Sequence, residues 1–277
     1  MKLLEVTDLS MRFGGLKALS DFNFAINGGE LVGLIGPNGA GKTTAFNAVT
    51  GVYKPTAGMV LLGGRRIDGL STVEINHAGI ARTFQNIRLF GSLSVLDNVM
   101  VGFNPKATHG LLGLLVRSPR FSREVEAFRQ QGMKLLETLK LAHVADRRAG
   151  SLPYGDQRRL EIARALATHP KVLCLDEPAA GMNPQEKVEL AKLIRFIRDE
   201  FKVGIWLIEH DMKLVMGICE RITVLDHGEV IAVGTPAEVC KSEKVIEAYL
   251  GEADAGDGLG AAAVVAESPP ENITGGR

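Results

Sequence analysis

Residues 36–44 of this chain read Gly36-Pro37-Asn38-Gly39-Ala40-Gly41-Lys42-Thr43-Thr44. The apolar run 31–35 precedes them and the helical pattern 45–49 follows, which predicts a buried strand that turns through a glycine-rich loop into a helix. Glycines at these spacings let backbone N–H groups surround a phosphate, and the start of the helix adds its positive dipole end. The stretch therefore predicts a P-loop that binds a nucleoside triphosphate.

The residues of this loop have separate predicted roles. Lys42 is expected to reach the β- and γ-phosphates, and the Thr43 hydroxyl is placed to ligate Mg²⁺. The other residues of the phosphate-binding loop are Gly36, Pro37, Asn38, Gly39, Ala40, Gly41 and Thr44. An ordinary glycine-rich turn is the alternative, but the full spacing and both flanking elements favour the P-loop.

Length, charge and cysteine content restrict the class of protein. A chain of 277 residues can bury one core, or one core with a subdomain. Its 32 basic and 32 acidic residues balance, so no net positive charge holds a polyanion, and no nucleic-acid partner is expected. The three cysteines, Cys174, Cys219 and Cys240, lack the paired spacing of a zinc site and are expected to be thiols in a reducing compartment.

The sequence shows neither a signal-peptide pattern nor a membrane span. Glu5 and Asp8 interrupt the N-terminus too early for the apolar core of a secretory signal. The longest apolar patch, residues 111–116, is far shorter than the roughly 20 residues that span a bilayer. We therefore expect a cytoplasmic protein, which can still dock on a membrane partner.

The segment before the P-loop predicts antiparallel β structure. Residues 4–7 and 22–26 alternate between the two faces of a strand, and Asn27-Gly28-Gly29 is a strong turn signal. Phe13 is predicted to be an aromatic residue in the loop between these strands. The residues alone leave two roles open for it, stacking on a purine ring or ordinary core packing.

A helical insertion is predicted after the first half of the nucleotide core. Residues 59–62 and 80–85 are expected to be strands, the second of them ending at Gln85. From about residue 86 to 167 apolar residues recur at helical spacing, with a loop over residues 104–120. This pattern predicts a helical subdomain between two strands of the core.

Two later strands end in ionisable side chains. The apolar run before Asp176 and Glu177 is typical of a buried parallel strand that ends at a ligand crevice. Asp176 is placed to hold Mg²⁺ through water, and Glu177 to polarise the water that attacks the γ-phosphate. His210 follows the predicted strand 203–208 and fits a γ-phosphate sensor, although a lone histidine is commonly structural.

The C-terminal part is predicted to contain a helix, a hairpin and a tail. The helix covers residues 184–201, and the hairpin pairs residues 221–225 with residues 229–234. Residues 253–277 are rich in Gly, Ala, Pro and acidic residues without periodicity, which predicts a disordered tail.

Together these motifs resemble the ATP-binding subunits of ABC transporters. The P-loop, Gln85, the stretch 152–166, the Asp176-Glu177 pair and His210 appear in the order of that family and cover residues 1 to about 250. Four stretches are similar, more narrowly, to the larger ATPase subunit of branched-chain amino-acid importers; they are residues 82–90, 154–161, 180–184 and 248–251.

The resemblance implies a fold and several residue roles. The fold is α/β: a P-loop NTPase core with a mostly parallel sheet, an N-terminal antiparallel β subdomain and an inserted α-helical subdomain, all within residues 1–252. Phe13 would stack on adenine. Gln85 would contact Mg²⁺ and couple to the membrane subunit, and His210 would be the switch histidine.

The resemblance also implies cofactors, partners and a location. Two ATPase subunits, identical copies or paralogues, close head to tail on two ATP molecules with Mg²⁺, and each signature covers the partner's phosphate. Transmembrane permease subunits and, indirectly, a periplasmic or extracellular amino-acid-binding protein complete the system. The chain is then peripheral on the inner face of a bacterial plasma membrane. Leu89, Phe90 and Leu93 would either grip a cytoplasmic permease helix or pack the helical subdomain.

The signature stretch departs from the family's pattern. Most of the family has Leu-Ser-Gly-Gly-Gln where this chain has Leu152-Pro153-Tyr154-Gly155-Asp156. Pro153 offers a phosphate neither a hydroxyl nor an N–H, although proline is tolerated in a first helical turn, and Asp156 adds a negative charge. We expect both changes to weaken this signature, so that the two composite sites are unequal. Asn183 also replaces an Asp of many relatives.

The function implied by the resemblance is ATP hydrolysis that powers import of leucine, isoleucine and valine. Similar ATPase subunits power systems with other cargo, such as lipid or lipopolysaccharide extractors. A soluble ABC ATPase acting on DNA or the ribosome is a further alternative, but the chain has one nucleotide domain and no basic tail. A degenerate nucleotide-binding module that does not hydrolyse ATP is another alternative. The joint presence of Lys42, Gln85, Glu177 and His210 disfavours it.

Overall fold

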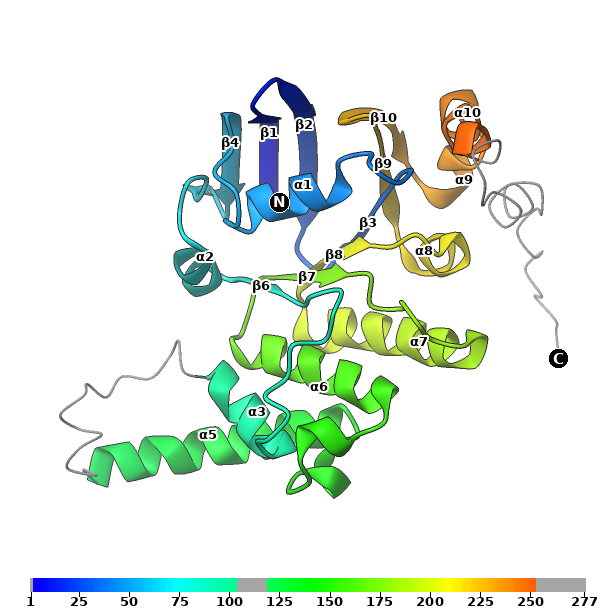
Figure 1. Ribbon diagram of the computed structural model, residues 1–277. Coiled ribbons are helices and arrows are strands. Elements are labelled where there is room, and N and C mark those ends of the chain that lie inside the picture. The colour runs from blue at the N-terminus through cyan, green and yellow to red at the C-terminus, as the bar shows by residue number, and fades with distance from the viewer. Residues whose placement is uncertain (1, 104–118, 253–277) are drawn as a thin grey trace, which may run out of the picture.

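The computed structural model describes residues 2–103 and 119–252, which form two sheets and a set of helices (Figure 1). The antiparallel sheet has the order β2-β1-β4-β5. It consists of β1 (Lys2–Phe13), β2 (Leu16–Asn27), β4 (Ala57–Leu62) and β5 (Arg65–Arg66). The second sheet has the order β10-β9-β3-β8-β7-β6. It consists of β3 (Leu31–Ile35), β6 (Ile80–Arg82), β7 (Val172–Asp176), β8 (Gly204–Ile208), β9 (Arg221–Asp226) and β10 (Glu229–Gly234).

The helices lie on both sides of the second sheet. They are α1 (Lys42–Val49), α2 (Thr72–Ala78), α3 (Val95–Gly102), α5 (Pro119–Thr138), α6 (Tyr154–Ala167), α7 (Pro184–Phe201), α8 (Met212–Ile218), α9 (Pro236–Val239) and α10 (Glu243–Glu252), with short 3-10 turns Ala142–Val144 and Ala149–Ser151. In Figure 1, α1 lies on the side of the antiparallel sheet, whereas α3, α5, α6 and α7 lie on the opposite side.

The second sheet is parallel except at one edge. β3 pairs in parallel with β8 and β9, and β7 pairs in parallel with β6 and β8. Only β10 runs antiparallel, to β9, which confirms the predicted hairpin. The predicted α/β fold with a mostly parallel sheet, an antiparallel N-terminal sheet and an inserted helical part is confirmed.

Alternate residues of the central strands enter two separate cores. Every residue of β3, β7 and β8 is buried. Leu31 and Ile35 join the core under α6 and α7, whereas Val32 and Leu34 join the core under α1 and the antiparallel sheet. Because successive strand residues point to opposite faces, a strand covered on both faces is apolar throughout.

Three details of the fold differ from the sequence predictions. Phe13 is the last residue of β1 and pairs with Leu16 in a tight hairpin, so it does not lie in a loop. β6 ends at Arg82 and does not extend to Gln85. Helix α2 was not predicted, although its Ser71 and Glu74 form a capping box, a pattern that is readable in the sequence.

Two predictions fall on other parts of the chain. The tail 253–277 and most of the predicted loop 104–120 lie outside the described residues, and the end of that loop begins α5.

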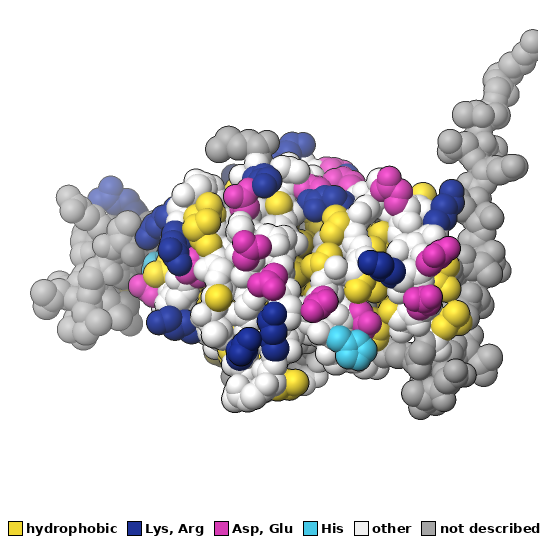
Figure 2. All heavy atoms as spheres, turned by 90° about the horizontal axis from the view of Figure 1, so that it is seen from above, with side chains coloured by type: hydrophobic (Ala, Val, Ile, Leu, Met, Phe, Trp, Pro, Cys, Tyr) yellow, Lys and Arg dark blue, Asp and Glu magenta, His cyan; other side chains and the backbone are white. Residues whose placement is uncertain are grey.

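Within the described ranges, no helix combines the length and apolar character needed to cross a bilayer. Figure 2, which views the molecule from the top of Figure 1, shows acidic and basic side chains interspersed over that face.

Candidate functional site

The P-loop needs glycine at two positions because the chain packs directly on it. Gly36 has φ +150°, and a Cβ there would lie 2.0 Å from the carbonyl oxygen of Leu225. Gly41, which precedes α1, has φ +100°, and a Cβ there would lie 2.8 Å from the carbonyl oxygen of Ala18. Any larger residue would push the loop away from β9 and β2, which shape it.

Lys42 is held against the loop that precedes it. Its Nζ donates hydrogen bonds of 2.6 and 2.7 Å to the carbonyl oxygens of Gly36 and Pro37. The side chain begins α1 and is buried, with 8% of the residue exposed. The ammonium group is therefore fixed beside the backbone of the loop, where the P-loop pattern predicts a phosphate-binding lysine.

A cavity of about 340 Å³ opens over the P-loop. Its lining consists of Leu16, Lys17, Ala18, Asn38, Gly39, Ala40, Gly41, Lys42, Thr43, Thr44, Glu177 and His227. The structure thus brings Glu177 to the same cavity as seven of the predicted P-loop residues. The other two, Gly36 and Pro37, do not line the cavity but accept hydrogen bonds from Lys42. His227 was not predicted, because it lies in the turn between β9 and β10.

Glu177 meets the two other predicted catalytic residues. Its Oε2 accepts a 2.7 Å hydrogen bond from Nε2 of Gln85 and lies 3.7 Å from Nδ1 of His210. These residues follow β7, β6 and β8, which are adjacent parallel strands, so their carboxyl ends meet at one edge of the sheet. Glu177 itself has φ +44°, and its N–H donates to the carbonyl oxygen of Ile208 at 2.9 Å.

Asp176 is paired with an arginine that the sequence analysis did not single out. Nη2 of Arg82 lies 2.7 Å from Oδ2 of Asp176, and their side chains are 12% and 9% exposed. Nη1 of Arg82 donates to Asn47 at 2.6 Å and to Thr50 at 3.1 Å. This network joins the end of α1 to β6 and β7, and no local sequence pattern predicts it.

Phe13 lies near the cavity with its ring against another aromatic residue. It is 42% exposed, and its ring makes a T-shaped contact with Tyr53 at 5.2 Å between centroids. Its hairpin partner Leu16 lines the P-loop cavity, whereas Phe13 itself does not. A ring in this position can offer a face to a base that extends beyond the cavity.

The signature stretch stands at the start of α6. Pro153 is the N-cap of that helix, with φ −55° and ψ 152° and no side-chain cap, so it lies just before the first turn. Its carbonyl oxygen accepts from the N–H groups of Asp156 and Gln157, both at 3.0 Å. Leu152 is buried, and a Cβ added at Gly155 would meet no atom within 4 Å.

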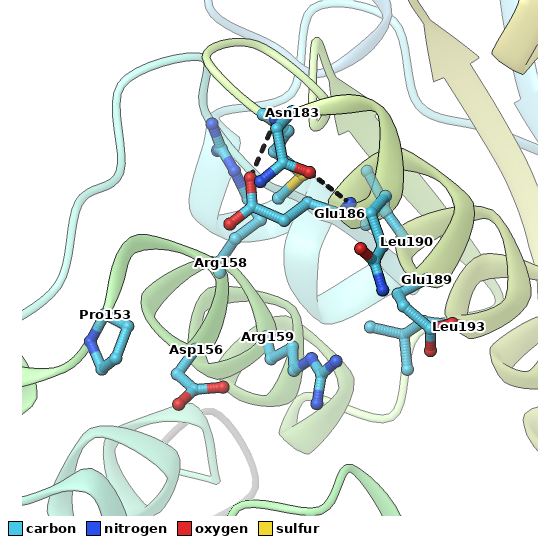
Figure 3. A pocket seen from close by; sticks show the side chains of 12 residues that line it. Pro153, Asp156, Arg158, Arg159, Asn183, Glu186, Glu189, Leu190 and Leu193 are labelled. Carbon is cyan, nitrogen blue, oxygen red and sulfur yellow. Dashed lines mark hydrogen bonds between the residues drawn. The ribbon is translucent and has the colours of Figure 1, made fainter.

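A separate cavity of about 360 Å³ lies between the starts of α6 and α7 (Figure 3). Pro153, Gly155 and Asp156 line it, opposite Asn183 and its neighbours on α7. In Figure 3, Asp156 and Arg158 point to opposite sides of α6. The signature residues therefore do not line this chain's own P-loop cavity.

Glu209, which precedes His210, is buried and holds the loop after Glu177. Its Oε1 accepts a 2.7 Å hydrogen bond from the N–H of Ala179, and 1% of the residue is exposed. Within the described ranges its Oε2 has no hydrogen-bond partner. Burial raises the pKa of this carboxyl above its ordinary value.

Comparisons with known proteins agree with this geometry. A sequence profile of the ABC transporter family matches residues 19–180, and one described as branched-chain amino acid ATP-binding cassette transporter matches residues 229–255. The chain is 48% identical to the high-affinity branched-chain amino acid transport ATP-binding protein LivG of Escherichia coli K12, over 91% of this chain and 98% of that protein. It is 46% identical to BraF of Pseudomonas aeruginosa, with the same coverage.

More distant relatives and solved structures show the same fold. The lipopolysaccharide export system ATP-binding protein LptB of Escherichia coli is 34% identical over 91% of this chain and 98% of that protein. A nucleotide-free ATP-binding cassette from an ABC transporter superposes with a TM-score of 0.78 at 32% identity, over 90% of this chain and 99% of that chain. The ADP conformation of MJ1267, another such cassette, has the same TM-score and identity over 91% and 99%.

The P-loop cavity, the acidic residue that lines it and these similarities agree on one assignment. This chain belongs to the ABC transporter family as one of its ATP-binding, ATP-hydrolysing subunits.

Proposed function

We propose that this chain hydrolyses ATP at the P-loop cavity to power an importer of branched-chain amino acids. The observation that carries the hydrolytic role is that Glu177 lines the same cavity as Lys42 and is oriented by Gln85. Similarity to LivG and BraF supports the cargo, and so does the profile match at residues 229–255. The identity to LptB is lower, which disfavours lipopolysaccharide as the cargo.

In this proposal residues 38–44 of the P-loop cradle the phosphates through their amides, Gly36 and Pro37 position Lys42 through their carbonyl oxygens, and Lys42 neutralises the β- and γ-phosphates. Phe13 stacks on adenine. A Mg²⁺ ion would be held by oxygens of Thr43 and Gln85 and, through water, by Asp176; oxygens are the hard donors that this cation prefers. When bound, the ion neutralises charge on the transferring phosphoryl group.

The remaining chemistry belongs to the ends of β7 and β8. Glu177 polarises the attacking water, and Gln85 orients the Glu177 carboxylate by donating a hydrogen bond to its Oε2. His210, 3.7 Å from the same carboxylate, senses the γ-phosphate. Catalysis then comes mainly from positioning and from charge neutralisation rather than from covalent chemistry.

The signature of this chain, residues 152–156, would complete the ATP site of a partner ATPase subunit. Pro153, Gly155 and Asp156 line a cavity apart from the P-loop cavity, and residues 152–156 present the start of α6, so they suit a nucleotide bound to another subunit. Pro153 contributes no hydroxyl there, and Asp156 contributes a negative charge. We propose that the site completed by this signature is weaker than the site formed by this chain's own Lys42 and Glu177.

A groove beside β6 is the proposed contact with a permease. Its volume is about 660 Å³, and it is lined by Asn76, Ala81, Arg82, Phe84, Arg88, Leu89, Phe90, Val101, Gly102, Glu161, Arg164, Ala165 and Thr168. Leu89 packs against the core of the helical part, whereas Phe90 and Leu93 are 49% and 37% exposed. Phe90 and Leu93 therefore suit a cytoplasmic helix, and the chain would sit on the inner face of the plasma membrane.

Reconstitution tests the proposal. The chain is co-purified with its permease subunits and second ATPase, placed in proteoliposomes, and assayed for ATPase with and without leucine-loaded binding protein. We expect stimulation by leucine that Glu177→Gln abolishes and that Glu137→Gln, an exposed carboxylate on α5, retains. ATPase that ignores every amino acid would contradict the cargo and leave the hydrolytic role intact.

A further inference from the structure

A closed ring of hydrogen bonds joins Glu177 to the start of α6. Nε2 of Gln85 donates to Glu177, and the carbonyl oxygen of Gln85 accepts from Nη2 of Arg158 at 2.9 Å. The same Nη2 donates to the hydroxyl oxygen of Tyr154 at 3.0 Å, and that hydroxyl donates to the carbonyl oxygen of Ala180 at 3.0 Å. The N–H of Ala180 donates to the carbonyl oxygen of Glu177 at 3.2 Å, which closes the ring.

The arginine in this ring is rigidly placed. Arg158 is fully buried, its Nη1 lies 2.9 Å from Oε2 of Glu161, and the same atom donates to the carbonyl oxygen of Phe84 at 2.8 Å. The other carboxylate oxygen of Glu161 accepts the N–H groups of Phe84 and Arg88 at 3.4 and 3.3 Å. Because a buried charged pair with several partners is costly to break, the loop after β6 moves together with α6.

Tyr154 supplies the part of the ring that reaches the loop after β7. The residue is 43% exposed, but its hydroxyl is held from both sides by Arg158 and Ala180. Its position is a glycine in the Leu-Ser-Gly-Gly-Gln pattern with which the signature was compared. Glycine has no hydroxyl, so this connection depends on the tyrosine.

We propose that Tyr154 is a positioning residue that couples the nucleotide facing α6 on the partner subunit to Glu177 of this chain. The inference rests on the proposed function, because it assigns the start of α6 to the partner's ATP. When α6 shifts toward that nucleotide, Arg158 moves with it and displaces the backbone of Gln85, to which it is hydrogen-bonded. The hydrogen bond from the Tyr154 hydroxyl displaces Ala180 in the same way. Both connections end on Glu177, so binding at one site orients the carboxylate at the other.

The first test uses the full chain without partners and measures amide hydrogen exchange. Tyr154→Phe keeps the ring and removes the hydroxyl, whereas Tyr154→Ala removes both. We expect both variants to accelerate exchange in residues 179–182 by about two- to tenfold, the effect of one lost hydrogen bond. Tyr249→Phe on α10 is the matched control. Wild-type exchange in Tyr154→Phe together with acceleration in Tyr154→Ala would show a packing role and overturn the proposal.

The second test measures ATPase in the assembled complex. We expect Tyr154→Phe to lower kcat by about two- to tenfold, with a smaller change in the KM for ATP, because the hydroxyl acts through Glu177. Gln85→Ala removes one of the two connections to Glu177 and Tyr154→Phe removes the other, so the double variant should lose more in kcat than the product of the two single losses. Additive effects of the two substitutions would overturn the coupling. An inactive wild-type complex would instead contradict the proposed function, and the exchange test would still decide whether the hydroxyl holds the loop.

Discussion

Nε2 of Gln85 lies 2.7 Å from Oε2 of Glu177, although 92 positions separate the two residues in the chain. The contact exists because β6 and β7 are neighbouring parallel strands, with Arg82 in register with Cys174, so the residues that follow them emerge side by side. The loop that follows β6 therefore controls the orientation of the carboxylate at the end of β7.

Glu177→Gln should abolish turnover while leaving nucleotide binding in place. The amide can still accept a hydrogen bond from Gln85 but cannot act as a general base, and loss of such a group costs about 10²- to 10⁴-fold in rate. Steady-state ATPase and binding of a fluorescent ATP analogue measure the two properties. Glu137→Gln is the control, and a variant that retained more than a tenth of the wild-type rate would contradict the role of Glu177.

Arg82→Met should destabilise the fold strongly. It leaves the carboxylate of Asp176, whose side chain is 9% exposed, without its cation, and breaking a buried pair in this way costs about 3–5 kcal/mol. Urea unfolding followed by circular dichroism measures the loss. Lys192→Met is the control because the side chains of Lys192 and its partner Glu189 are 66% and 51% exposed, so little change is expected. Equal effects of the two substitutions would refute the prediction.

Glu209→Gln should change the pH dependence of stability in a defined direction. Burial raises the pKa of Glu209 above its ordinary value of 4.5, so the folded state binds this proton more tightly than the unfolded state. This carboxyl therefore lowers wild-type stability as pH rises from 4.5 through the folded pKa. We expect the melting temperature of the variant, relative to wild type, to rise from pH 4 to pH 7.

Glu238→Gln provides a control of opposite sign. The backbone N–H and hydroxyl of Thr235 hold the pKa of Glu238 below its ordinary value, so its stabilising effect grows as pH rises to neutrality. The melting temperature of this variant should fall relative to wild type from acidic to neutral pH. If Glu209→Gln followed the same trend as Glu238→Gln, the assignment of a raised pKa to Glu209 would be wrong.

Pro153→Ser combined with Asp156→Gln should raise the ATPase rate of the assembled complex. The serine restores a hydroxyl at the N-cap of α6, and the glutamine removes a negative charge from its first turn, where a partner's phosphate is proposed to dock. An increase of several-fold in kcat is expected. Pro236→Ser, at the start of α9, is the control, and an unchanged rate in the double variant would remove the basis for unequal sites.

Local patterns were sufficient to predict the P-loop and the acidic pair. The loop at residues 36–44 needs glycines and a lysine at fixed spacing, and the run before Asp176 needs continuous apolar residues because both faces of β7 are covered. These requirements act within a few residues, so they are visible in one sequence. The helix that begins at Pro184 was predicted for the same reason, and the structure gives it the same bounds.

The partners of these residues were decided only by the tertiary structure. The pairing of Arg82 with Asp176 and the ring through Tyr154, Arg158 and Ala180 join positions that are distant in the chain. Periodicity tells which side chains are buried, but it does not tell which polar group each one meets. Because a buried charge is tolerated only where a partner neutralises it, the packing of α6 against the loops after β6 and β7 determined these contacts.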